Sequence, residues 1–322
     1  MRKAILLYNP QSGRRPKYRV ADIESALKVL RSAGVDVTAE PTVSSEGTTG
    51  QARLAIAHGC DTIFACGGDG TIHDVLQAVV GTQVAIGVIP LGTANTLAHD
   101  LRIPLSAVPA ARAALESSPR RLAAGRITFR DFHGQTRSRY FTVTAGIGVD
   151  AHLFYKLDAL VKGHLGMLAY YLKATGLWLT HDMRTFNVGV SREGSSGESA
   201  RSEEVSQLLA VRIRHFGGVL RELAPGASLS RNDLRLVLFK TRNRLLYLAY
   251  ILRGLFGRQW AVSGIELADA EKVACTESSV PTDLKIYVEA DGELLGALPA
   301  EISIVPDAFT LLVPPASLPP QP

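Results

Sequence analysis

The stretch from Ala65 to Asp74, ACGGDGTIHD, places one acid between glycines directly after an apolar run. Asp61–Cys66 is predicted to be a buried strand and Ile72–Val80 an amphipathic helix, so the glycines fall in a strand-to-helix turn. Glycines let backbone N–H groups approach a phosphate closely, and the following helix adds the positive end of its dipole. The stretch therefore predicts a phosphate-binding turn in an α/β sheet.

The acid in this turn, Asp69, would repel a bare phosphate. It makes physical sense if its carboxylate faces a divalent cation that a nucleotide brings, held directly or through water. We therefore predict that Asp69 contacts a divalent cation carried by a nucleotide. A lone GGDG is also typical of an ordinary turn. No G-x-x-x-x-G-K-[ST] pattern occurs in the sequence, which excludes the usual P-loop enzymes.

Two further loops follow predicted strands in the same way. NPQSG, at Asn9–Gly13, follows the predicted strand Ala4–Tyr8, and PLGTAN, at Pro90–Asn95, follows the predicted strand Val84–Ile89. Because the carboxyl ends of parallel strands share one edge of a sheet, we expect the three loops to converge on one site. Taken alone, NPQSG is more typical of a β-turn with a helix cap at Ser12.

The chain changes character after its first third. Strands and helices alternate up to Pro119, which predicts a largely parallel sheet, and short β-like runs then indicate a second, mainly antiparallel domain from about Gly125. The remaining predicted strands are Val35–Thr42, Ile127–Phe132, Tyr140–Ala145, Thr185–Val190, Leu208–Ile213, Leu234–Phe239, Ile286–Ala290 and Phe309–Val313. The remaining predicted helices are Tyr18–Ala33, Thr48–His58, Ala94–Leu101, Ala151–Leu179 and Arg242–Phe256, and Gly194–Ser202 is predicted to be a hairpin tip.

Composition narrows the classes of protein. The 322 residues are 46% hydrophobic and 20% charged, which suits two soluble domains. Three cysteines without a CxxC pair argue against a disulfide framework or a zinc ribbon and favour a reducing compartment. The net charge of +5 is only a weak signal for an anionic partner, and nothing else supports nucleic-acid binding. No segment resembles a secretory signal or a spanning helix, so we expect a cytoplasmic protein or one peripheral to the inner face of the membrane.

These loops closely resemble the motifs of the diacylglycerol kinase catalytic-domain family of lipid kinases, which includes bacterial soluble diacylglycerol kinases and sphingosine kinases. NPQSG resembles NPxSG, GGDGTIHD resembles GGDGTxNE, and PLGTAN resembles PxGTxN. Tyr140–Ala151 (YFTVTAGIGVDA) resembles the segment that opens the family's second domain, and Asp291-Gly292-Glu293 resembles its late DGE. GGDGT alone is shared with NAD kinases, whereas the ordered set of five is highly specific and covers nearly the whole chain.

The resemblance implies an α/β fold in two domains. The first, over residues 1–124, would be a nucleotide-binding α/β domain of the NAD-kinase and phosphofructokinase-like type. The second, over 125–305, would be a β-sandwich for the lipid substrate, with the active site in the interdomain cleft and the last strand, near 306–316, returning to the first domain. The implied reaction transfers the γ-phosphate of ATP to the hydroxyl of a lipid at a membrane surface, most readily diacylglycerol or a sphingosine-like lipid. ATP and Mg²⁺ are the implied cofactors, with Asp69 facing the ATP-bound Mg²⁺, and a homodimer is left open.

The resemblance also assigns roles to residues. Glu293 would accept the proton of the lipid hydroxyl, with Asp291 beside it and Asp69 as the third catalytic residue. The DGE segment is otherwise typical of an exposed hairpin turn. The implied nucleotide contacts are Asn9, Pro10, Gln11, Ser12, Gly13, Thr42, Gly67, Gly68, Gly70, Thr71, Ile72, His73, Asp74, Gly92, Thr93 and Asn95.

The chain departs from the family pattern at three positions. Thr96 and Ala123 stand where the family usually has aspartates that take part in a magnesium network, so Asp69 has fewer carboxylates behind it. Arg231 stands where a ligand of a second, structural Mg²⁺ is expected, and we predict that no structural metal binds there. These losses leave open a different lipid substrate or a catalytically impaired nucleotide- or lipid-binding homologue.

Other interpretations remain. A NAD kinase-like enzyme shares the first fold and GGDGT. Gly146–Ala151 matches G-x-G-x-x-A, but apolar and aromatic residues stand at Leu168–Tyr171, where a dinucleotide-binding protein needs an acid. Arg242–Arg258 could be an interfacial helix or a helix that caps the sandwich. His152–Thr180 could line an acyl pocket or belong to the core.

Overall fold

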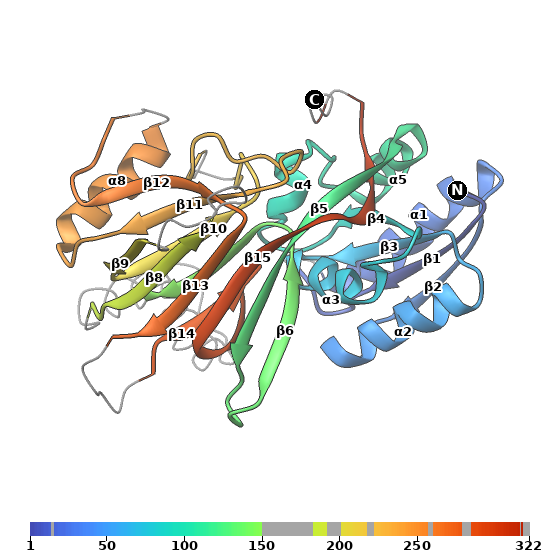
Figure 1. Cartoon of the computed structure of the whole chain (residues 1–322). Coiled ribbons are helices and arrows are strands. Elements are labelled where there is room, and N and C mark those ends of the chain that lie inside the picture. The colour runs from blue at the N-terminus through green and yellow to red at the C-terminus, as the bar shows by residue number, and fades with distance from the viewer. Residues whose placement is uncertain are drawn as a thin grey trace.

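The computed structural model describes residues 1–13, 16–149, 183–191, 201–217, 222–256, 260–278, 285–315 and 317. The first half is built on a parallel sheet in the order β2-β1-β3-β4 (Figure 1). Every residue of β3 and β4 is buried, because helices cover both faces of the sheet. The four strands are β1 (Lys3–Tyr8), β2 (Asp36–Pro41), β3 (Thr62–Gly67) and β4 (Ala85–Pro90).

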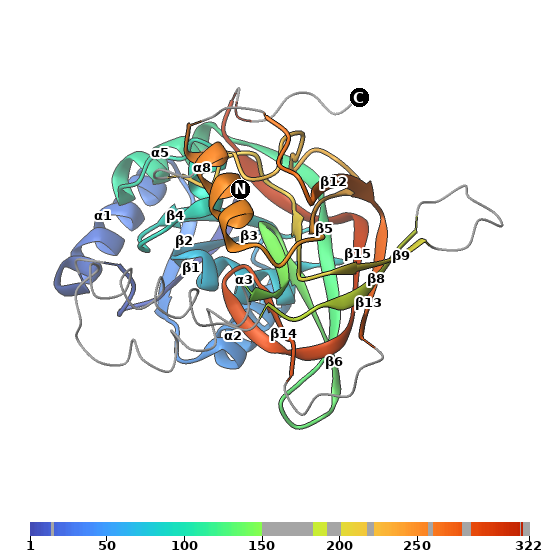
Figure 2. The same cartoon turned by 90° about the vertical axis from the view of Figure 1, so that its left-hand side faces the viewer.

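Helices cover the parallel sheet in two pairs (Figures 1 and 2). α1 (Arg19–Ser32), which follows the short η1 (Pro16–Tyr18), packs with α5 (Ala107–Glu116) on one face. α2 (Ser45–Ala57) and α3 (Asp69–Val79) pack together on the other. The short α4 (Thr96–Asp100) follows the β4 loop. This arrangement leaves the loops at the carboxyl ends of β1, β3 and β4 at one edge of the sheet, as predicted.

The second half is an antiparallel β-sandwich. One layer runs in the order β12-β11-β10-β7-β14, the other contains β6-β5 and β13-β8-β9, and β15 joins the two. Side chains from both layers, including Phe129, Phe186, Leu208 and Leu236, form one buried cluster. The two-domain α/β fold expected from the sequence is confirmed. The strands are β5 (Ser118–Arg130), β6 (Thr136–Phe141), β7 (Thr144–Gly148), β8 (Phe186–Ser191), β9 (Arg201–Val205), β10 (Gln207–Val211), β11 (Leu234–Phe239), β12 (Ile265–Ala270), β13 (Lys272–Glu277), β14 (Tyr287–Ala290) and β15 (Glu293–Val313).

One strand connects the two halves. β15 begins at Glu293 antiparallel to β14, runs alongside β5, and ends parallel to β4, where Thr310 pairs with Ala85 and Leu311 with Ile86. The register against β5 shifts twice, between Ala297 and Glu301 and between Val305 and Phe309. β15 therefore runs without interruption from the DGE segment to the parallel sheet.

Several element boundaries differ from the sequence predictions. α3 begins at Asp69 rather than Ile72, so the acid belongs to the first turn of the helix. The predicted strand Tyr140–Ala145 is wrong as a single element: it is divided between β6 and β7, because the backbone N–H groups at the break bond to a side chain instead of a neighbouring strand. The predicted strand Ile127–Phe132 overlaps the end of the longer β5, which stops at Arg130.

Among the α-helices and strands, α5, β12 and β13 had no sequence prediction, nor did most of β9; Arg201 and Ser202, predicted to end a hairpin tip, are instead the first residues of β9. The buried face of α5 consists of four alanines, a weak apolar signal. β12 (IELADA) and β13 (KVACTE) carry acids and alanines within their alternating patterns, which lowers their apparent β propensity. The predicted helix Ala151–Leu179 and all but the last two residues of the predicted tip Gly194–Ser202 lie outside the described residues.

Candidate active site

The three predicted loops contact one another at the edge of the parallel sheet. The backbone N–H of Asn9 donates to the Cys66 carbonyl at 3.0 Å, and that of Leu91 donates to the Gly67 carbonyl at 2.8 Å. Gly92 packs directly against Gly68, because a Cβ added to Gly92 would lie 2.3 Å from the Gly68 Cα. The convergence expected from three separate sequence motifs is therefore present.

The NPQSG loop is held by its own polar groups and by the β4 loop. The Asn9 side-chain oxygen accepts from the Gln11 N–H at 2.9 Å, and Pro10 and Gln11 form the turn. The Ser12 hydroxyl donates to the Asn9 carbonyl at 3.2 Å and to the Leu91 carbonyl at 3.3 Å, and it does not cap α1, whose N-cap is Tyr18. Gly13 has a φ of +73°, and an added Cβ there would lie 2.3 Å from the Leu91 carbonyl oxygen. Glycine is required at this position on both grounds.

A buried arginine that the sequence did not reveal fastens these two loops. Arg19, at the start of α1, is 3% exposed and donates to the carbonyls of Ser12, at 2.5 Å, and Leu91, at 2.9 Å. It also pairs with Asp22 at 3.5 Å. Burial lowers the pKa of Arg19, with the carboxylate of Asp22 opposing the shift. In the sequence, Arg19 looks like an ordinary exposed residue of a predicted helix, so its role could not be predicted.

The GGDGT segment is the junction between β3 and α3. Gly67 ends the strand, and a Cβ there would meet the Thr71 hydroxyl at 2.2 Å. Gly68 is the residue before the helix, and α3 begins at Asp69. The first-turn N–H groups of α3 therefore face the edge where the loops meet, which is the arrangement that binds anions.

The carboxylate of Asp69 lies against the start of α4. One oxygen accepts from the Thr96 N–H at 3.1 Å and lies 3.3 Å from the Thr96 hydroxyl, and the other accepts from the Leu97 N–H at 3.3 Å. Burial raises the pKa of Asp69, the bonds from Thr96 and Leu97 lower it, and the charge of Asp291 adds to the rise. Thr96 thus supplies a donor to Asp69 at the position where the family pattern has a second acid.

The PLGTAN loop is closed by Asn95. This residue has a φ of +50°, its side-chain oxygen accepts from the Gly92 N–H at 2.9 Å, and its amide donates to the Gly92 carbonyl at 3.1 Å. Thr93 is exposed and lines a pocket of about 410 Å³ beside the loop, together with Arg19 and Ser106. The loop is rigid where it meets Gly68 and presents Thr93 outward.

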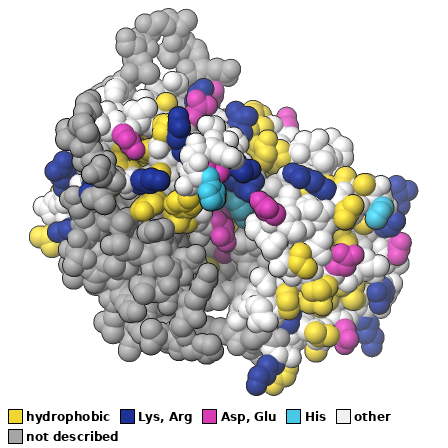
Figure 3. Space-filling view, turned by 90° about the horizontal axis from the view of Figure 1, so that it is seen from below, with side chains coloured by type: hydrophobic (Ala, Val, Ile, Leu, Met, Phe, Trp, Pro, Cys, Tyr) yellow, Lys and Arg dark blue, Asp and Glu magenta, His cyan; other side chains and the backbone are white. Residues whose placement is uncertain are grey.

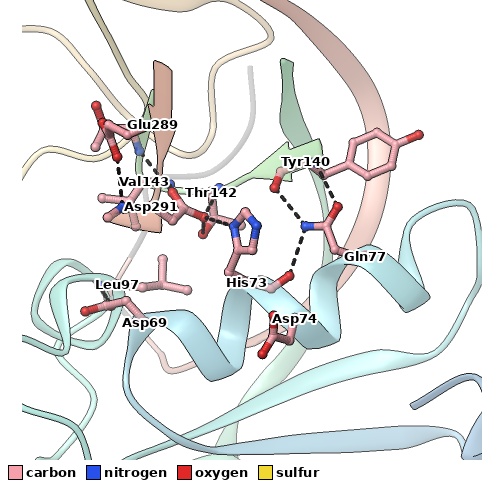
Figure 4. A network of polar contacts seen from close by, with 12 residues as sticks. Asp69, His73, Asp74, Gln77, Leu97, Tyr140, Thr142, Val143, Glu289 and Asp291 are labelled. Carbon is pink, nitrogen blue, oxygen red and sulfur yellow. Dashed lines mark hydrogen bonds and ion pairs between the residues drawn. The ribbon is translucent and has the colours of Figure 1, made fainter. Parts of the chain in front are cut away.

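The DGE segment forms the hairpin between β14 and β15, where Asp291 and Gly292 have φ values of +50° and +82°. The Asp291 carboxylate is 2% exposed and accepts N–H groups from Thr142, Val143 and Thr144 at 3.0, 2.8 and 3.2 Å (Figure 4). These bonds are the reason that β6 and β7 are separate strands. The lone pairs of Asp291 are therefore committed to the protein, unlike those of a residue that reacts with a substrate.

Glu293 has a different environment from Asp291. Glu293 is exposed, and one of its carboxylate oxygens lies only 2.8 Å from the position of a Cβ added to Gly70, in the first turn of α3. The hairpin of the second half thus brings Glu293 against GGDGT. Acidic and histidine side chains gather near the middle of the face seen from below in Figure 3, with lysine or arginine side chains beside them.

The other predicted contacts lie around this centre with different exposures. Thr42 follows β2, where its N–H donates to the Tyr8 carbonyl at 2.8 Å. Ile72 is 3% exposed within the core of the first half, so only its backbone can reach the site. Asp74 accepts from the Ser45 hydroxyl, and burial raises its pKa. His73 is 2% exposed and contacts Asp291.

Asp69 offers a carboxylate as an oxygen donor for Mg²⁺ at this edge of the sheet. Among the described residues, no three His, Cys, Asp or Glu side chains are grouped to hold a metal ion. Mg²⁺ bound with a nucleotide needs only one or two carboxylates besides the phosphates. The half-buried Asp69, beside the first turn of α3, fits that requirement.

The region around Arg231 is occupied by arginines. Arg231 contacts Asp233 through two nitrogens, at 2.6 and 2.5 Å, and lies 3.3 Å from Asp269. The fully buried Arg212 donates to the carbonyls of Leu229, Arg231 and Asp233 and to that of Ala123. Burial lowers the pKa of Arg212 to about 10. Guanidinium groups satisfy both the carboxylates and the carbonyls of this loop.

Two family models together match most of the chain. Residues 3–127 match the family described as the diacylglycerol kinase catalytic domain, and residues 143–313 match the YegS C-terminal NAD kinase beta sandwich-like domain. The diacylglycerol kinase of Bacillus subtilis (strain 168) is 30% identical over 94% of this chain and 93% of its own. That of Staphylococcus aureus (strain MRSA252) is 28% identical over 93% of this chain and 88% of its own.

Solved structures share the fold. Three from Bacillus anthracis str. Sterne, described with the words diacylglycerol kinase, align with TM-scores of 0.76, 0.73 and 0.70 at 21%, 20% and 18% identity. Each alignment covers 98% of this chain and 96%, 98% and 98% of theirs. Yeast NADH kinase complexed with NADH aligns with a TM-score of 0.53 at 10% identity, over 98% of this chain and 84% of its own.

Proposed function

The chain belongs to the diacylglycerol kinase catalytic-domain family, and we propose that it transfers the γ-phosphoryl group of ATP to the hydroxyl of a lipid, diacylglycerol or a sphingosine-like lipid. Kinase membership follows from the family; the nucleotide and the lipid are the proposal. The observation that carries it is the position of Glu293. This residue lies against Gly70, where the NPQSG, GGDGT and PLGTAN loops meet.

The first half binds the nucleotide in this proposal. Backbone N–H groups of NPQSG and of the first turn of α3 approach the phosphates, since the glycines leave no Cβ in the way. Thr93 and Thr42 border the same edge. Asp69 faces the nucleotide's Mg²⁺, and when bound this ion neutralises phosphate charge. Phosphoryl transfer needs positioning and charge neutralisation more than covalent help from the protein.

The second half supplies the proton acceptor. The lipid oxygen forms a bond to the γ-phosphorus while the bond from that phosphorus to the bridging oxygen breaks, and ADP leaves. Glu293 takes the hydroxyl proton, because among the DGE residues it is the exposed acid whereas Asp291 is saturated with N–H donors. A general base must lie within hydrogen-bond reach of the proton it removes.

A membrane surface is the proposed source of the lipid. α8 (Arg244–Phe256) packs Tyr247 and Tyr250 onto Phe239, so it caps the sandwich on one side. Its other side exposes Leu245, at 72%, and Leu248, at 41%, and the helix carries no acidic residue. An apolar helix face with basic residues near it is typical of interfacial binding. Of the helices the structure describes, none has the length and hydrophobicity to span a bilayer.

The test is a phosphorylation assay with labelled ATP. Diacylglycerol, monoacylglycerol, sphingosine, ceramide and phosphatidylglycerol are offered in mixed micelles, with NAD as a parallel acceptor. Label on a lipid at a rate that depends on enzyme supports the proposal. Label on NAD alone would establish the NAD kinase-like alternative, and binding of ATP without any transfer would identify an impaired homologue.

A further inference from the structure

One face of α3 contacts the second half of the chain at three positions, and Figure 4 shows two of them, His73 and Gln77. Gly70, His73 and Gln77 follow the i, i+3, i+7 spacing that places side chains on one side of a helix. Gln77 accepts from the Tyr140 N–H at 2.9 Å and donates to the Tyr140 carbonyl at 2.9 Å, which fastens the helix to β6. Gly70 faces Glu293. The helix that begins the GGDGT site is thus attached to the second half along its length.

His73 makes the middle one of these three contacts. Its Nδ1 lies 3.4 Å from a carboxylate oxygen of Asp291, and both side chains are 2% exposed. An ionised carboxylate can only accept, so we assign the proton of the imidazole to Nδ1. Asp291 belongs to the same hairpin as Glu293 and lies two residues before it. His73 therefore joins α3 to the hairpin that carries the proposed base.

Other bonds hold this hairpin from the side of the second half. The Asp291 N–H donates to the Thr144 carbonyl at 2.8 Å, and its carboxylate receives three N–H groups around the break between β6 and β7. The Gly292 N–H donates to Glu289, which is fully buried, at 2.9 Å. The hairpin is rigid within its own half, and His73 connects it to the nucleotide-binding half.

We propose that His73 is a positioning residue, and that its Nδ1–H···Asp291 bond sets where Glu293 lies relative to the first turn of α3. The inference rests on the proposed function for its kinetic consequence. It also defines the donor needed at position 73: the side-chain nitrogen of asparagine stands at the same place beyond Cβ as His Nδ1, so asparagine can make the same bond to Asp291. Glutamine would place its nitrogen one atom further away.

The first test compares His73→Leu, His73→Asn and His73→Gln. Loss of the bond lets Glu293 shift, and misplacement of about 1 Å can cost about 100-fold in rate. H73L should lower kcat by about that factor and leave the KM for ATP within a factor of about two, because the His73 side chain is 2% exposed and faces Asp291, and its loss leaves the backbone groups of the nucleotide loops in place. H73N should regain most of the turnover lost in H73L, and H73Q should not. Unchanged kcat in H73L would overturn the inference.

Gln77→Met is the matched control. It also cuts a bond between α3 and the second half, but to β6 instead of the hairpin. Its melting temperature should fall, because the backbone groups of Tyr140 lose their partner, while its kcat should fall far less than that of H73L. If Q77M and H73L lower kcat equally, general docking of α3 sets the rate and the specific role of His73 is refuted.

A readout without turnover separates this inference from the proposed function. Hydrogen exchange at the N–H groups of Thr142–Thr144 and Gly292 should be faster in H73L than in the wild type, and near wild type in H73N. If the wild type phosphorylates no lipid but the three proteins show this exchange pattern, the proposed function is refuted and the role of the His73–Asp291 bond is retained. If the wild type is active and exchange is identical in all variants, only the inference about the His73–Asp291 bond is refuted.

Discussion

Thr96 directs both its backbone N–H, at 3.1 Å, and its hydroxyl, at 3.3 Å, to a single oxygen of Asp69. A neutral donor thus occupies the position where the family pattern has a second acid. In this chain the carboxylate of Asp69 is held by hydrogen bonds before any cation reaches it.

The acid limb of the pH–rate profile should report this environment. Burial raises the pKa of Asp69, so kcat/KM should fall as the pH is lowered through a value above the ordinary aspartate pKa of about 3.9. The Thr96 hydroxyl opposes the rise, so Thr96→Val should move the limb to higher pH. Profiles of the two proteins, measured side by side, check this. Coincident limbs would mean that a group other than Asp69 titrates. The variant Asp69→Asn should fold normally and be inactive.

The contact of Gly92 with Gly68 should make Gly92→Ala costly. The added Cβ would lie 2.3 Å from a backbone atom, so the two loops must separate. We expect a loss of about 1–3 kcal/mol in the free energy of unfolding and weaker ATP binding. Gly50→Ala in α2 is the control: no atom lies within 4 Å of its Cβ, and it should stabilise by about 0.5–1 kcal/mol. Urea unfolding and ATP titration measure both; equal stabilities for the two variants would contradict the loop contact.

Glu293→Gln tests the proton acceptor. Removal of a general base typically costs about 10²–10⁴-fold, and we expect that loss in kcat with unchanged ATP affinity. The control is Glu301→Gln, on the same strand. The Glu301 carboxylate lies 2.9 Å from the Lys272 ammonium and takes no part in the site. Turnover of E293Q at the wild-type rate would assign proton acceptance to another group.

The arginines around residue 231 should make the fold independent of a structural metal. Removal of divalent ions by EDTA should leave the melting temperature unchanged, because Arg231 already neutralises Asp233 and lies 3.3 Å from Asp269. Arg231→Asp should reverse this, with Mg²⁺ raising the melting temperature of the variant. A wild-type melting temperature that drops in EDTA and returns with Mg²⁺ would refute the prediction.

The exposed side of α8 should bind anionic bilayers. Leu245→Asp with Leu248→Asp removes apolar surface and adds negative charge, so flotation with phosphatidylglycerol-containing vesicles should be reduced. Leu54→Asp on α2, where the side chain is 62% exposed, controls for a general loss of surface hydrophobicity. If L54D reduces flotation as much as the double variant, α8 is not the docking surface.

The sequence predicted what depends on short, contiguous patterns. Three glycine loops after three strands were sufficient to place NPQSG, GGDGT and PLGTAN at one edge, because parallel strands share that edge. The hairpin character of DGE was one of its two interpretations, and the structure contains both the hairpin and the approach of Glu293 to Gly70.

What the sequence did not predict depends on contacts between distant residues. Arg19 reaches the Leu91 carbonyl across 72 positions, and Asp291 reaches Val143 across 148. The second contact divides a continuous β-like stretch into two strands, a break that local propensity cannot reveal. Paired acids at Asp291 and Glu293 look alike in sequence, and only their burial separates a structural carboxylate from an exposed one.

The pairing of β15 with β4 has a consequence for the order of synthesis. β4 ends at Pro90 and its neighbour β15 ends at Val313, so 223 residues (313 − 90) are translated between the two ends. At about 5–20 residues per second, the outer edge of β4 has no native strand beside it for roughly 10–45 s. An exposed strand edge invites pairing with other chains. During that interval the nascent sheet is exposed to misassembly, and chaperone binding near Ala85–Pro90 would protect it.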